Sequence, residues 1–325
     1  MPGAKNLIGA VAFPRGVADP EADLACFENL AGFVEGIELV SGKRRWRSPV
    51  AGEPVFAARG FVIVVRPPQA CRLEAETGRL LDEHVLPLDL PPVAEPSNVQ
   101  FTAHLRGDLL GLEWRADGRY SGGAPVPDEI RRGFERRFGG VIEWDLRTGA
   151  LRTGAAGTAP TEDDLPSWPY RQRGVWRERA WRCGELTLRL AADESRTAGQ
   201  ESISLQRAEG GALRSTGPSW APPIEPTVTP DGCHLLVRRT APPAGPWEVV
   251  DVRAARELAR VPYREGSQFP AIIGARLFFM TAPRPGSPAA LHAVDLASCT
   301  EVWQLTLDPP MARGAPPLPR SGPAP

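Results

Sequence analysis

The sequence has no apolar run long enough to cross a bilayer, which takes about 20 residues in a helix. Its N-terminal apolar stretch, residues 7–13, stops at Pro14. The first nineteen residues also lack the continuous apolar core of a secretory signal peptide. We therefore expect no membrane span and a cytoplasmic location.

Paired cysteines and metal-ligand spacings are missing as well. The five cysteines are odd in number and never form a C-x-x-C pair: Cys26, Cys71, Cys183, Cys233 and Cys299. We expect free buried thiols rather than a disulfide framework or a zinc site. The four histidines show neither HxH nor HExxH spacing: His84, His104, His234 and His292. We therefore expect no metal ion and no cofactor.

The chain also lacks an excess of charge of one sign. Its 38 Lys and Arg residues face 39 Asp and Glu residues, for a formal net charge of −1. Binding to phosphates relies on a positive field, so nucleic acid is not an expected partner. The nucleotide-binding and nucleophile motifs GxxxxGK[ST], GxGxxG and GxSxG are absent too. We expect a protein that is not an enzyme.

The sequence does contain one short motif that recurs six times, and each copy is called a phrase below. Five copies begin with an acidic residue, all continue with an apolar or small residue, and four carry glycine at the turn. The copies are Glu38–Trp46, Glu74–Asp82, Asp145–Thr153, Arg207–Ser215, Asp251–Ala259 and Asp295–Trp303. Each copy predicts a strand, a tight turn and a returning strand.

Glycine suits these turns because it adopts a positive φ without steric cost. The turn positions are Gly42, Gly78, Gly149, Gly211, Ala255 and Cys299. A second hairpin precedes most copies, as in residues 54–66 around Gly60. Two hairpins per unit, repeated about every forty residues, are typical of the four-stranded blades of a β-propeller.

We therefore predict an all-β fold, a single β-propeller of six four-stranded antiparallel blades over residues 1–307. The expected blades cover residues 7–48, 51–88, 97–155, 172–217, 223–263 and 268–307. A seventh blade before Gly149 is the alternative to an insertion there. Residues 7–13 either begin the first blade or complete the last one. A proline-rich tail, residues 308–325, is expected to be disordered.

Two segments interrupt the repeat. Residues 127–138 predict a short amphipathic helix, and residues 154–173 predict a loop insertion with clustered acids. The helix would carry apolar side chains on one face and arginines beside them: Ile130, Phe134 and Phe138, with Arg131 and Arg137. This face either packs on the propeller's own rim, binds a partner protein or lies on a membrane surface. The five residues are our candidate partner-binding site.

Three further places have weaker functional interpretations. Residues 43–47 form either a basic patch or a solvated strand edge that discourages strand addition. His104 and Arg238 fall on strands expected near the central channel, where an enzyme would gather its reactive groups. They are weak candidates for such a site, and His234 also lies beside a strand expected to line the channel.

Residues 70–81 and 290–303 resemble the repeat of quinoprotein-like (PQQ-repeat, WD40-like) bacterial β-propellers. Leu291, Asp295 and Trp303 match that repeat, and Ser298–Cys299 replaces its Thr-Gly. The resemblance implies blade structure over most of residues 35–307. It implies no catalytic residue, because members that use a quinone are typically larger and carry a calcium site and adjacent cysteines.

The function expected from these observations is a non-catalytic scaffold that mediates protein–protein interaction. By analogy with bacterial propellers encoded beside ATPases, we expect it to be a subunit of a bacterial multi-protein system, one linked to an ATPase being an example. The alternative is a propeller enzyme, a lyase or hydrolase, or a sensor that binds a small ligand in the central channel.

Overall fold

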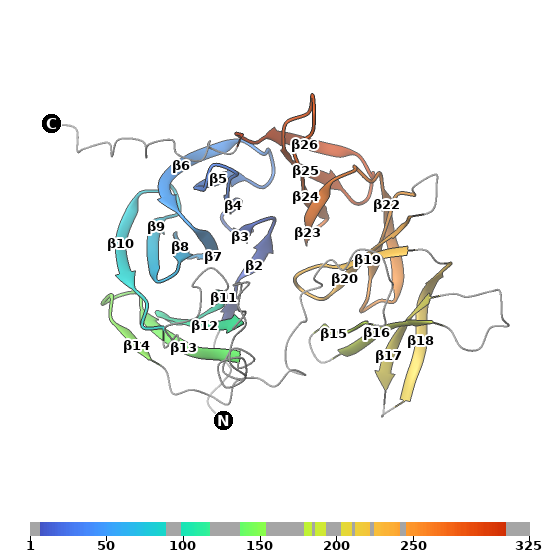
Figure 1. Cartoon of the computed structure of the whole chain (residues 1–325), viewed down its shortest axis with the longest axis horizontal. Coiled ribbons are helices and arrows are strands. Elements are labelled where there is room, and N and C mark those ends of the chain that lie inside the picture. Colours follow the sequence, from blue (N-terminus) through green and yellow to red (C-terminus); the bar gives the residue numbers. More distant parts are fainter. Residues whose placement is uncertain are drawn as a thin grey trace, which may run out of the picture. The chain divides into compact units, whose positions relative to one another are not determined.

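The computed structural model describes residues 7–88, 99–117, 137–153, 179–183, 186–192, 203–209, 212–221, 224–240 and 245–309 (Figure 1). Every regular element in these residues is a β-strand, and no helix capable of spanning a membrane occurs among them. Six antiparallel sheets form, so the expected all-β class is confirmed.

The first three sheets have the orders β2-β3-β4-β5-β6, β10-β9-β8-β7 and β1-β11-β12-β13-β14. Their strands are β1 (Leu7–Gly9), β2 (Val11–Phe13), β3 (Gly16–Asp19), β4 (Leu24–Glu28), β5 (Phe33–Glu38), β6 (Arg44–Ala51), β7 (Glu53–Ala58), β8 (Phe61–Arg66), β9 (Gln69–Glu74), β10 (Leu80–Val85), β11 (Val99–Arg106), β12 (Leu109–Asp117), β13 (Arg137–Asp145) and β14 (Leu151–Thr153).

The other three sheets have the orders β15-β16-β17-β18, β19-β20-β21-β22 and β23-β24-β25-β26. Their strands are β15 (Arg179–Cys183), β16 (Leu186–Ala192), β17 (Ile203–Glu209), β18 (Ala212–Trp220), β19 (Ile224–Val228), β20 (His234–Arg239), β21 (Trp247–Asp251), β22 (Arg256–Val261), β23 (Ser267–Ile273), β24 (Arg276–Thr281), β25 (Ala290–Asp295) and β26 (Glu301–Thr306).

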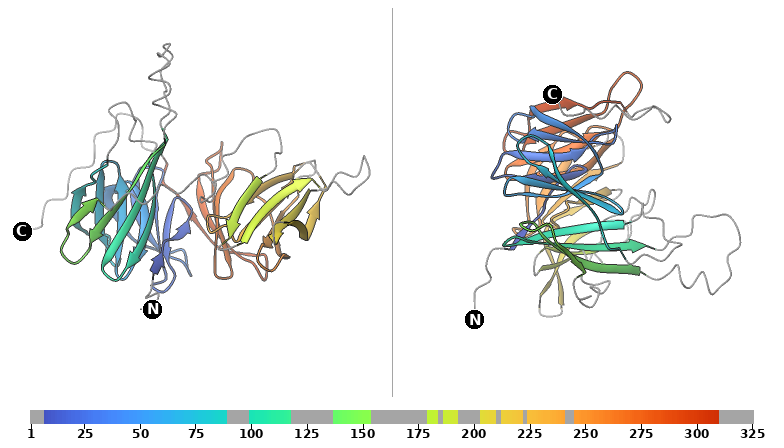
Figure 2. Two further views of the ribbon diagram at one scale, coloured as in Figure 1. Left: turned by 90° about the horizontal axis from the view of Figure 1, so that it is seen from below. Right: turned by 90° about the vertical axis from the view of Figure 1, so that its left-hand side faces the viewer.

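The chain divides into two compact units. Unit 1 comprises Met1–Val11, Arg15–Pro160 and Asp308–Pro325, and unit 2 comprises Ala12–Pro14 and Thr161–Leu307. Consecutive strands of each sheet pair as a meander of neighbours, which Figure 2 shows from two sides. This is the connectivity that a propeller blade requires.

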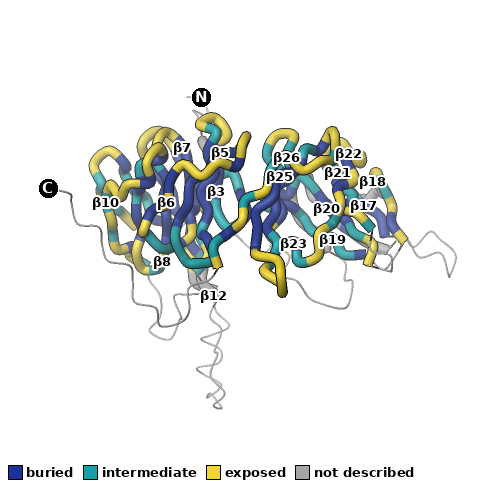
Figure 3. Tube along the Cα trace, turned by 90° about the horizontal axis from the view of Figure 1, so that it is seen from above, coloured by how far each residue is buried: buried dark blue, intermediate teal, exposed yellow. Residues whose placement is uncertain are grey.

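Within each unit, successive sheets bury apolar side chains between them. In unit 1, Val62 and Leu73 of the second sheet pack with the first sheet, and Ile63 and Trp144 join the second sheet to the third. In unit 2, one cluster joins the fourth and fifth sheets and another the fifth and sixth. Buried residues fill the middle strands, whereas the connecting turns are exposed (Figure 3).

The N-terminal stretch differs in part from its prediction. Residues 7–13 form two short strands, and β1 pairs with β11 in the third sheet, with Ile8 opposite Leu105. Residues 11–13, as β2, thus begin the first sheet as one alternative expected, whereas residues 7–9 extend the third sheet, and neither strand completes the last one. The backbone edge of β11 that β12 leaves free accepts β1, because an unpaired strand edge is a template for another strand.

The repeated turns are confirmed wherever the structure describes them. Gly42, Gly78 and Gly149 have φ values of 70°, 70° and 75°. Ala255 and Cys299 adopt the same left-handed conformation, with φ values of 51° and 58°, although each carries a Cβ atom. Gly211 lies outside the described residues. Turn position, rather than residue type, is therefore what the repeat preserves.

The aspartate that opens three of the phrases, Asp145, Asp251 and Asp295, caps its own turn. Asp145 Oδ1 accepts hydrogen bonds from the backbone N–H groups of Arg147 and Thr148, at 2.9 and 3.0 Å. Asp295 accepts the equivalent bonds from Ala297 and Ser298. These backbone hydrogen bonds hold the pKa of both carboxyl groups below the usual range. The acid thus belongs to the turn and is not available for catalysis.

The helical insertion needs a correction at its C-terminal end. Arg137 and Phe138 belong to β13, in register with Asp117 and Ala116 of β12, so the predicted helix does not reach residue 138. Two glycines follow directly, and their backbone continues the pairing with β12. The rest of the predicted helix, the 154–173 insertion and the tail from residue 310 lie outside the described residues.

We predict that Ala255→Gly stabilises the protein by up to about 1 kcal/mol. Removing the side chain relieves the strain of the left-handed conformation, which is about 1–2 kcal/mol. The greater freedom of glycine in the unfolded chain offsets about 0.5–1 kcal/mol of this gain. Denaturant unfolding measures the difference. The matched control Gly149→Ala should destabilise by about 1 kcal/mol, and the same sign for both variants would contradict the turn geometry.

Candidate functional site

The turn of a repeated phrase is the place where the preceding sheet attaches. Trp46 of β6 donates its indole N–H to the carbonyl oxygen of Ala75 at 2.8 Å, and its ring covers Gly78 so closely that a Cβ there would clash. In the next sheet, Arg72 bonds the carbonyl oxygen of Leu146. In unit 2, the Arg207 guanidinium bonds the carbonyl oxygen of Arg253 at 2.9 Å. All three acceptors follow the first residue of a phrase by one or two positions.

The basic run at residues 43–47 is neutralised by its own sheet. Arg44 Nε and Arg47 Nη2 lie 2.8 and 2.6 Å from the carboxylate of Glu35, which is fully buried in β5. Arg45 pairs with Asp23 and Glu38 at 3.8 Å. Of the two sequence interpretations, the structure favours the charged edge over a basic patch free to bind an anion.

Asp308 extends this cluster. Its carboxylate pairs with Arg47, the residue that also binds Glu35. Asn29 donates a hydrogen bond to Glu35 at 2.7 Å from the opposite side. The sequence assigned Asp308 to the disordered tail, but the structure fixes it to the first sheet.

A polar cluster around His292 is the chemically richest place in the described residues. His292 of β25 is buried, and its ring stacks on Phe279 with centroids 4.9 Å apart. Its Nδ1 lies 2.9 Å from the carboxylate of Glu301, and its Nε2 lies 3.1 Å from Thr281 Oγ1. Arg264 binds Glu301 at 2.7 Å.

The partners of His292 assign its proton. The Glu301 carboxylate, paired with Arg264, accepts from an N–H on Nδ1, which leaves Nε2 to accept from Thr281; Arg264 Nη1 also lies 3.3 Å from Nδ1. Burial lowers the pKa of His292, an effect that outweighs the hydrogen bond to Glu301. The ring is therefore neutral at pH 7, in the state in which an imidazole acts as a general base.

A β-bulge creates both the Glu35 and the His292 clusters. Between β25 and β26, Val294 faces Glu301 while Ala293 faces Trp303, so Val302 is an extra residue. Glu301 and Gln304 consequently share the His292 face, although residues three apart ordinarily point to opposite faces.

The same bulge occurs at the equivalent place in the first sheet. Ile37 faces Arg44 while Gly36 faces Trp46, which leaves Arg45 as the extra residue. Glu35 and His292 each stand three residues before the first residue of a phrase. A buried polar residue at that position therefore meets two side chains of the outer strand. The sequence pattern contains this relation, but the bulge that makes it useful leaves no signal in composition.

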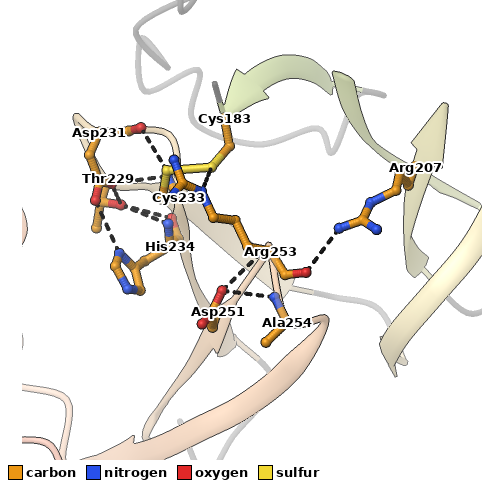
Figure 4. Close-up of a disulfide and its surroundings, with 9 residues drawn as sticks. All are labelled: Cys183, Arg207, Thr229, Asp231, Cys233, His234, Asp251, Arg253 and Ala254. Carbon is orange, nitrogen blue, oxygen red and sulfur yellow. Dashed lines mark hydrogen bonds and ion pairs between the residues drawn. A yellow bond between two sulfur atoms is a disulfide. The ribbon is translucent and has the colours of Figure 1, made fainter. Parts of the chain in front are cut away.

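A disulfide joins the fourth and fifth sheets of unit 2, so the expectation of free thiols is wrong for Cys183 and Cys233, whereas Cys26, Cys71 and Cys299 are free. Cys183 ends β15 and Cys233 precedes β20, and their Cα atoms are 5.1 Å apart, within the range of disulfides (Figure 4). Both cysteines lie at the first-hairpin turns of consecutive sheets. Because the two cysteines are 50 residues apart, their spacing in the sequence gives no sign that they pair. Alignment of the repeat units on their first hairpins is the signal that could have found the pair.

The other candidate histidines and arginines are bound within their own sheets. His234 Nδ1 lies 3.2 Å from Asp231 Oδ2 in the turn before β20. Arg238 pairs with Glu225, and its guanidinium lies 3.9 Å from the ring centroid of Tyr263. His104 of β11 packs against Gly111, where a Cβ would clash with its ring. His104 belongs to unit 1 and Arg238 to unit 2, and neither joins a reactive cluster among the described residues.

The structure describes only two of the five residues of the predicted partner-binding site. Ile130, Arg131 and Phe134 lie outside the described residues, whereas Arg137 and Phe138 lie in β13. Their role in binding a partner stays a prediction.

Exposed apolar side chains gather on one edge strand instead. Among the large apolar residues that the structure describes as exposed, Leu80, Leu81 and Val85 belong to β10, the outermost strand of the second sheet. Val85 is 68% exposed. The remaining ones are scattered: Val40, Leu109, Phe269 and Val302.

Comparison with known proteins assigns no family. No family model matches the chain, and no curated protein matches it. Within the described ranges, no group of three or more His, Cys, Asp or Glu side chains is arranged to hold a metal ion.

Three solved structures illustrate the similarities that exist. BamB from Moraxella catarrhalis is 11% identical over 84% of this chain and 82% of its own, with a TM-score of 0.34. TolB from Acinetobacter baumannii is 12% identical over 88% and 63%, at 0.32. An oligogalacturonate lyase from Vibrio parahaemolyticus is 11% identical over 85% and 88%, at 0.41. Similarities this low assign neither family nor activity.

We predict that stability falls as the pH drops below about 6.5 and that His292→Gln reduces the fall. The folded-state pKa of His292 is lowered, so the unfolded chain binds the proton first and protonation favours unfolding. The contribution is fully present above the unfolded pKa and is lost as the pH falls toward the folded one. Denaturant unfolding between pH 7.5 and 5 measures it. His234→Gln is the control, and an unchanged pH dependence in His292→Gln would contradict the assignment.

Proposed function

We propose that the protein is a non-catalytic β-propeller scaffold that binds a partner protein along the edge strand β10. Six antiparallel meanders, packed sheet on sheet within each unit, support the propeller. The concentration of exposed apolar side chains on β10 is the observation that carries the binding role.

Two other outer strands, β6 and β22, are better protected than β10. β6 carries Arg44, Arg45 and Arg47 together with a proline, and β22 exposes Arg256, Glu257 and Arg260. Charge and proline on an edge discourage pairing with another chain. β10 instead offers Leu80, Leu81 and Val85, with Glu83 the acid among its exposed side chains. This edge fits an extended partner segment with apolar side chains around a basic one.

We further propose that the protein works in an oxidising compartment rather than in the cytoplasm. The Cys183–Cys233 disulfide supports this, because disulfides persist outside the reducing cytoplasm and are rare within it. An ATPase-linked system as the partner stays a prediction from the sequence.

We predict that Leu81→Lys combined with Val85→Lys weakens binding of the partner at least about tenfold. Both side chains are exposed, so the free energy of unfolding should change by less than about 0.5 kcal/mol. A photo-crosslinker at residue 85 of the full chain identifies the partner, and titration of that partner against each variant measures the affinity.

The control for this experiment is Val302→Lys, which places one lysine at an exposed position of the edge strand β26. It should bind the partner as the wild type does. Equal loss of binding in the control, or a chain that remains monomeric and uncrosslinked in native extracts, would refute the β10 site.

The His292 cluster supports one second candidate, a hydrolase that acts by acyl transfer. Thr281 Oγ1, His292 and Glu301 are connected in the order hydroxyl, imidazole, carboxylate, by distances of 3.1 and 2.9 Å. In this order the neutral imidazole accepts the hydroxyl proton as the oxygen attacks a carbonyl carbon, and the carboxylate stabilises the resulting imidazolium.

We predict that, if this candidate holds, the protein turns over activated aryl esters and loses that activity in both Thr281→Val and His292→Gln. Each loss should be at least about a hundredfold, the scale of general-base catalysis. Thr306→Val on β26 is the control for an exposed threonine away from the cluster. No turnover by the wild type would remove the candidate and leave the scaffold proposal untouched.

A further inference from the structure

The two cysteines of the disulfide in unit 2 differ in their exposure to solvent. Cys183 is buried, with 1% of its surface exposed, whereas Cys233 is partly exposed in the turn between β19 and β20. A thiolate arriving from solution therefore reaches Cys233 Sγ. Attack on this sulfur leaves the electron pair of the broken bond on Cys183 Sγ.

A guanidinium group stands beside the sulfur that would leave. Arg253 Nε lies 3.1 Å from Cys183 Sγ (Figure 4). A bonded disulfide sulfur is only a weak acceptor, whereas a thiolate at the same place would form a charge-assisted hydrogen bond. A neighbouring cation lowers the pKa of a thiol, and a thiol of lower pKa leaves faster in exchange.

Two hydrogen bonds hold Arg253 in this position. Asp251 Oδ1 accepts the backbone N–H of Arg253 at 2.8 Å, as the first acid of a repeated phrase does elsewhere. The carbonyl oxygen of Arg253 accepts from Arg207 Nη2 of the fourth sheet at 2.9 Å. These bonds fix the backbone of Arg253, and the contact of its Nε with Cys183 Sγ already places the guanidinium in the oxidised protein, so little ordering is needed when the thiolate forms.

The surroundings of Cys233 have the opposite charge. Asp231 Oδ1 accepts the backbone N–H of Cys233 at 3.0 Å, and Asp231 Oδ2 lies 3.2 Å from His234 Nδ1. Burial alone raises the pKa of Asp231, but its hydrogen bonds to His234, Thr229 and Cys233 outweigh that effect and lower it. A carboxylate next to Cys233 disfavours a thiolate there, so the charges on both sides give the exchange one direction.

We propose that Cys183–Cys233 is a site of thiol–disulfide exchange, at which an external dithiol attacks Cys233 and Cys183 leaves as a thiolate held by Arg253. A sulfur–sulfur bond forms between the dithiol and Cys233 as the native bond breaks. The second thiol of the reagent then attacks this mixed disulfide and releases Cys233. Two electrons pass to the protein, and the reagent becomes a cyclic or protein-borne disulfide.

Opening the bond frees the first-hairpin turns of two neighbouring sheets without removing their shared core. Leu188 and Leu205 of the fourth sheet and Leu235 and Val250 of the fifth remain buried together. The reduced protein should therefore stay folded, with local loosening at Cys183 and at the Thr229–His234 turn. The inference is independent of the scaffold proposal, because it needs no partner at β10.

The direction of exchange can be tested on the oxidised wild-type full chain. Brief reaction with glutathione, acid quenching, alkylation and peptide mapping should find glutathione on Cys233 and the alkyl group on Cys183. Equal labelling, or glutathione on Cys183, would overturn the proposal.

The role of Arg253 can be tested by rates of reduction with dithiothreitol. Arg253→Gln should slow reduction about three- to tenfold, since the leaving thiol loses its cation. Arg253→Lys should recover part of the rate, and Arg256→Gln, on the same turn, should react as the wild type does. Equal rates for Arg253→Gln and Arg256→Gln would refute the role of the guanidinium.

A second measurement separates this role from a structural one. In Cys233→Ser, the rate of alkylation of Cys183 against pH should show a lowered thiol pKa, which Arg253→Gln in the same background raises. An unchanged alkylation profile would contradict the proposal even if reduction slows. If Arg253→Gln fails to fold, the peptide map of the wild type still decides the direction of attack.

Discussion

The carbonyl group that follows the first residue of a repeated phrase is where one sheet receives the side chain of the sheet before it. This carbonyl oxygen can accept a hydrogen bond from the neighbouring sheet because the turn beside it is stabilised by other groups. These are the capping carboxylate, as at Asp145 and Asp251, and the left-handed residue at the end of the turn. Trp46 and Arg72 differ in chemistry, yet both donate to this group. The constraint therefore lies in the backbone of the turn, and the donor can vary as long as it reaches.

The β-bulge that follows the turn in the first and last sheets has a second consequence, because it brings residues three apart in the outer strand to one face. In the first sheet this encloses Glu35 between two arginines and yields an ion-pair cluster. In the last sheet it sets His292 against Glu301 and, through Arg264, Gln304. The same β-bulge therefore gives an ion-pair cluster around Glu35 and a neutral imidazole at His292. The chemistry of each cluster depends on which side chain stands three residues before the phrase.

The sequence predicts the turns well because their requirement is local: a left-handed residue preceded by a carboxylate four positions earlier. It predicts the location of all six sheets for the same reason. It fails where contacts cross between units of the repeat. Nothing local in residues 7–13 indicates pairing with β11, and two cysteines 50 residues apart become neighbours only when consecutive first hairpins are superposed. Arg137 and Phe138 fit a helical stripe by spacing, but the edge of β12 takes them into a strand.

Arg253 takes part in the turn, in the contact between two sheets and in the surroundings of the disulfide. Its backbone N–H completes the cap by Asp251, its carbonyl oxygen receives Arg207 from the preceding sheet, and its side chain lies on Cys183. The Cys183–Cys233 bond and the hydrogen bond from Arg207 to Arg253 thus join the same two sheets, and they are not redundant. The disulfide restricts the unfolded chain, whereas the hydrogen bond acts only in the folded state. When the disulfide is cleaved, the hydrogen bond from Arg207 still holds Arg253 near the new Cys183 thiolate. The arrangement that directs opening of the disulfide therefore also keeps the two cysteines in place for reoxidation.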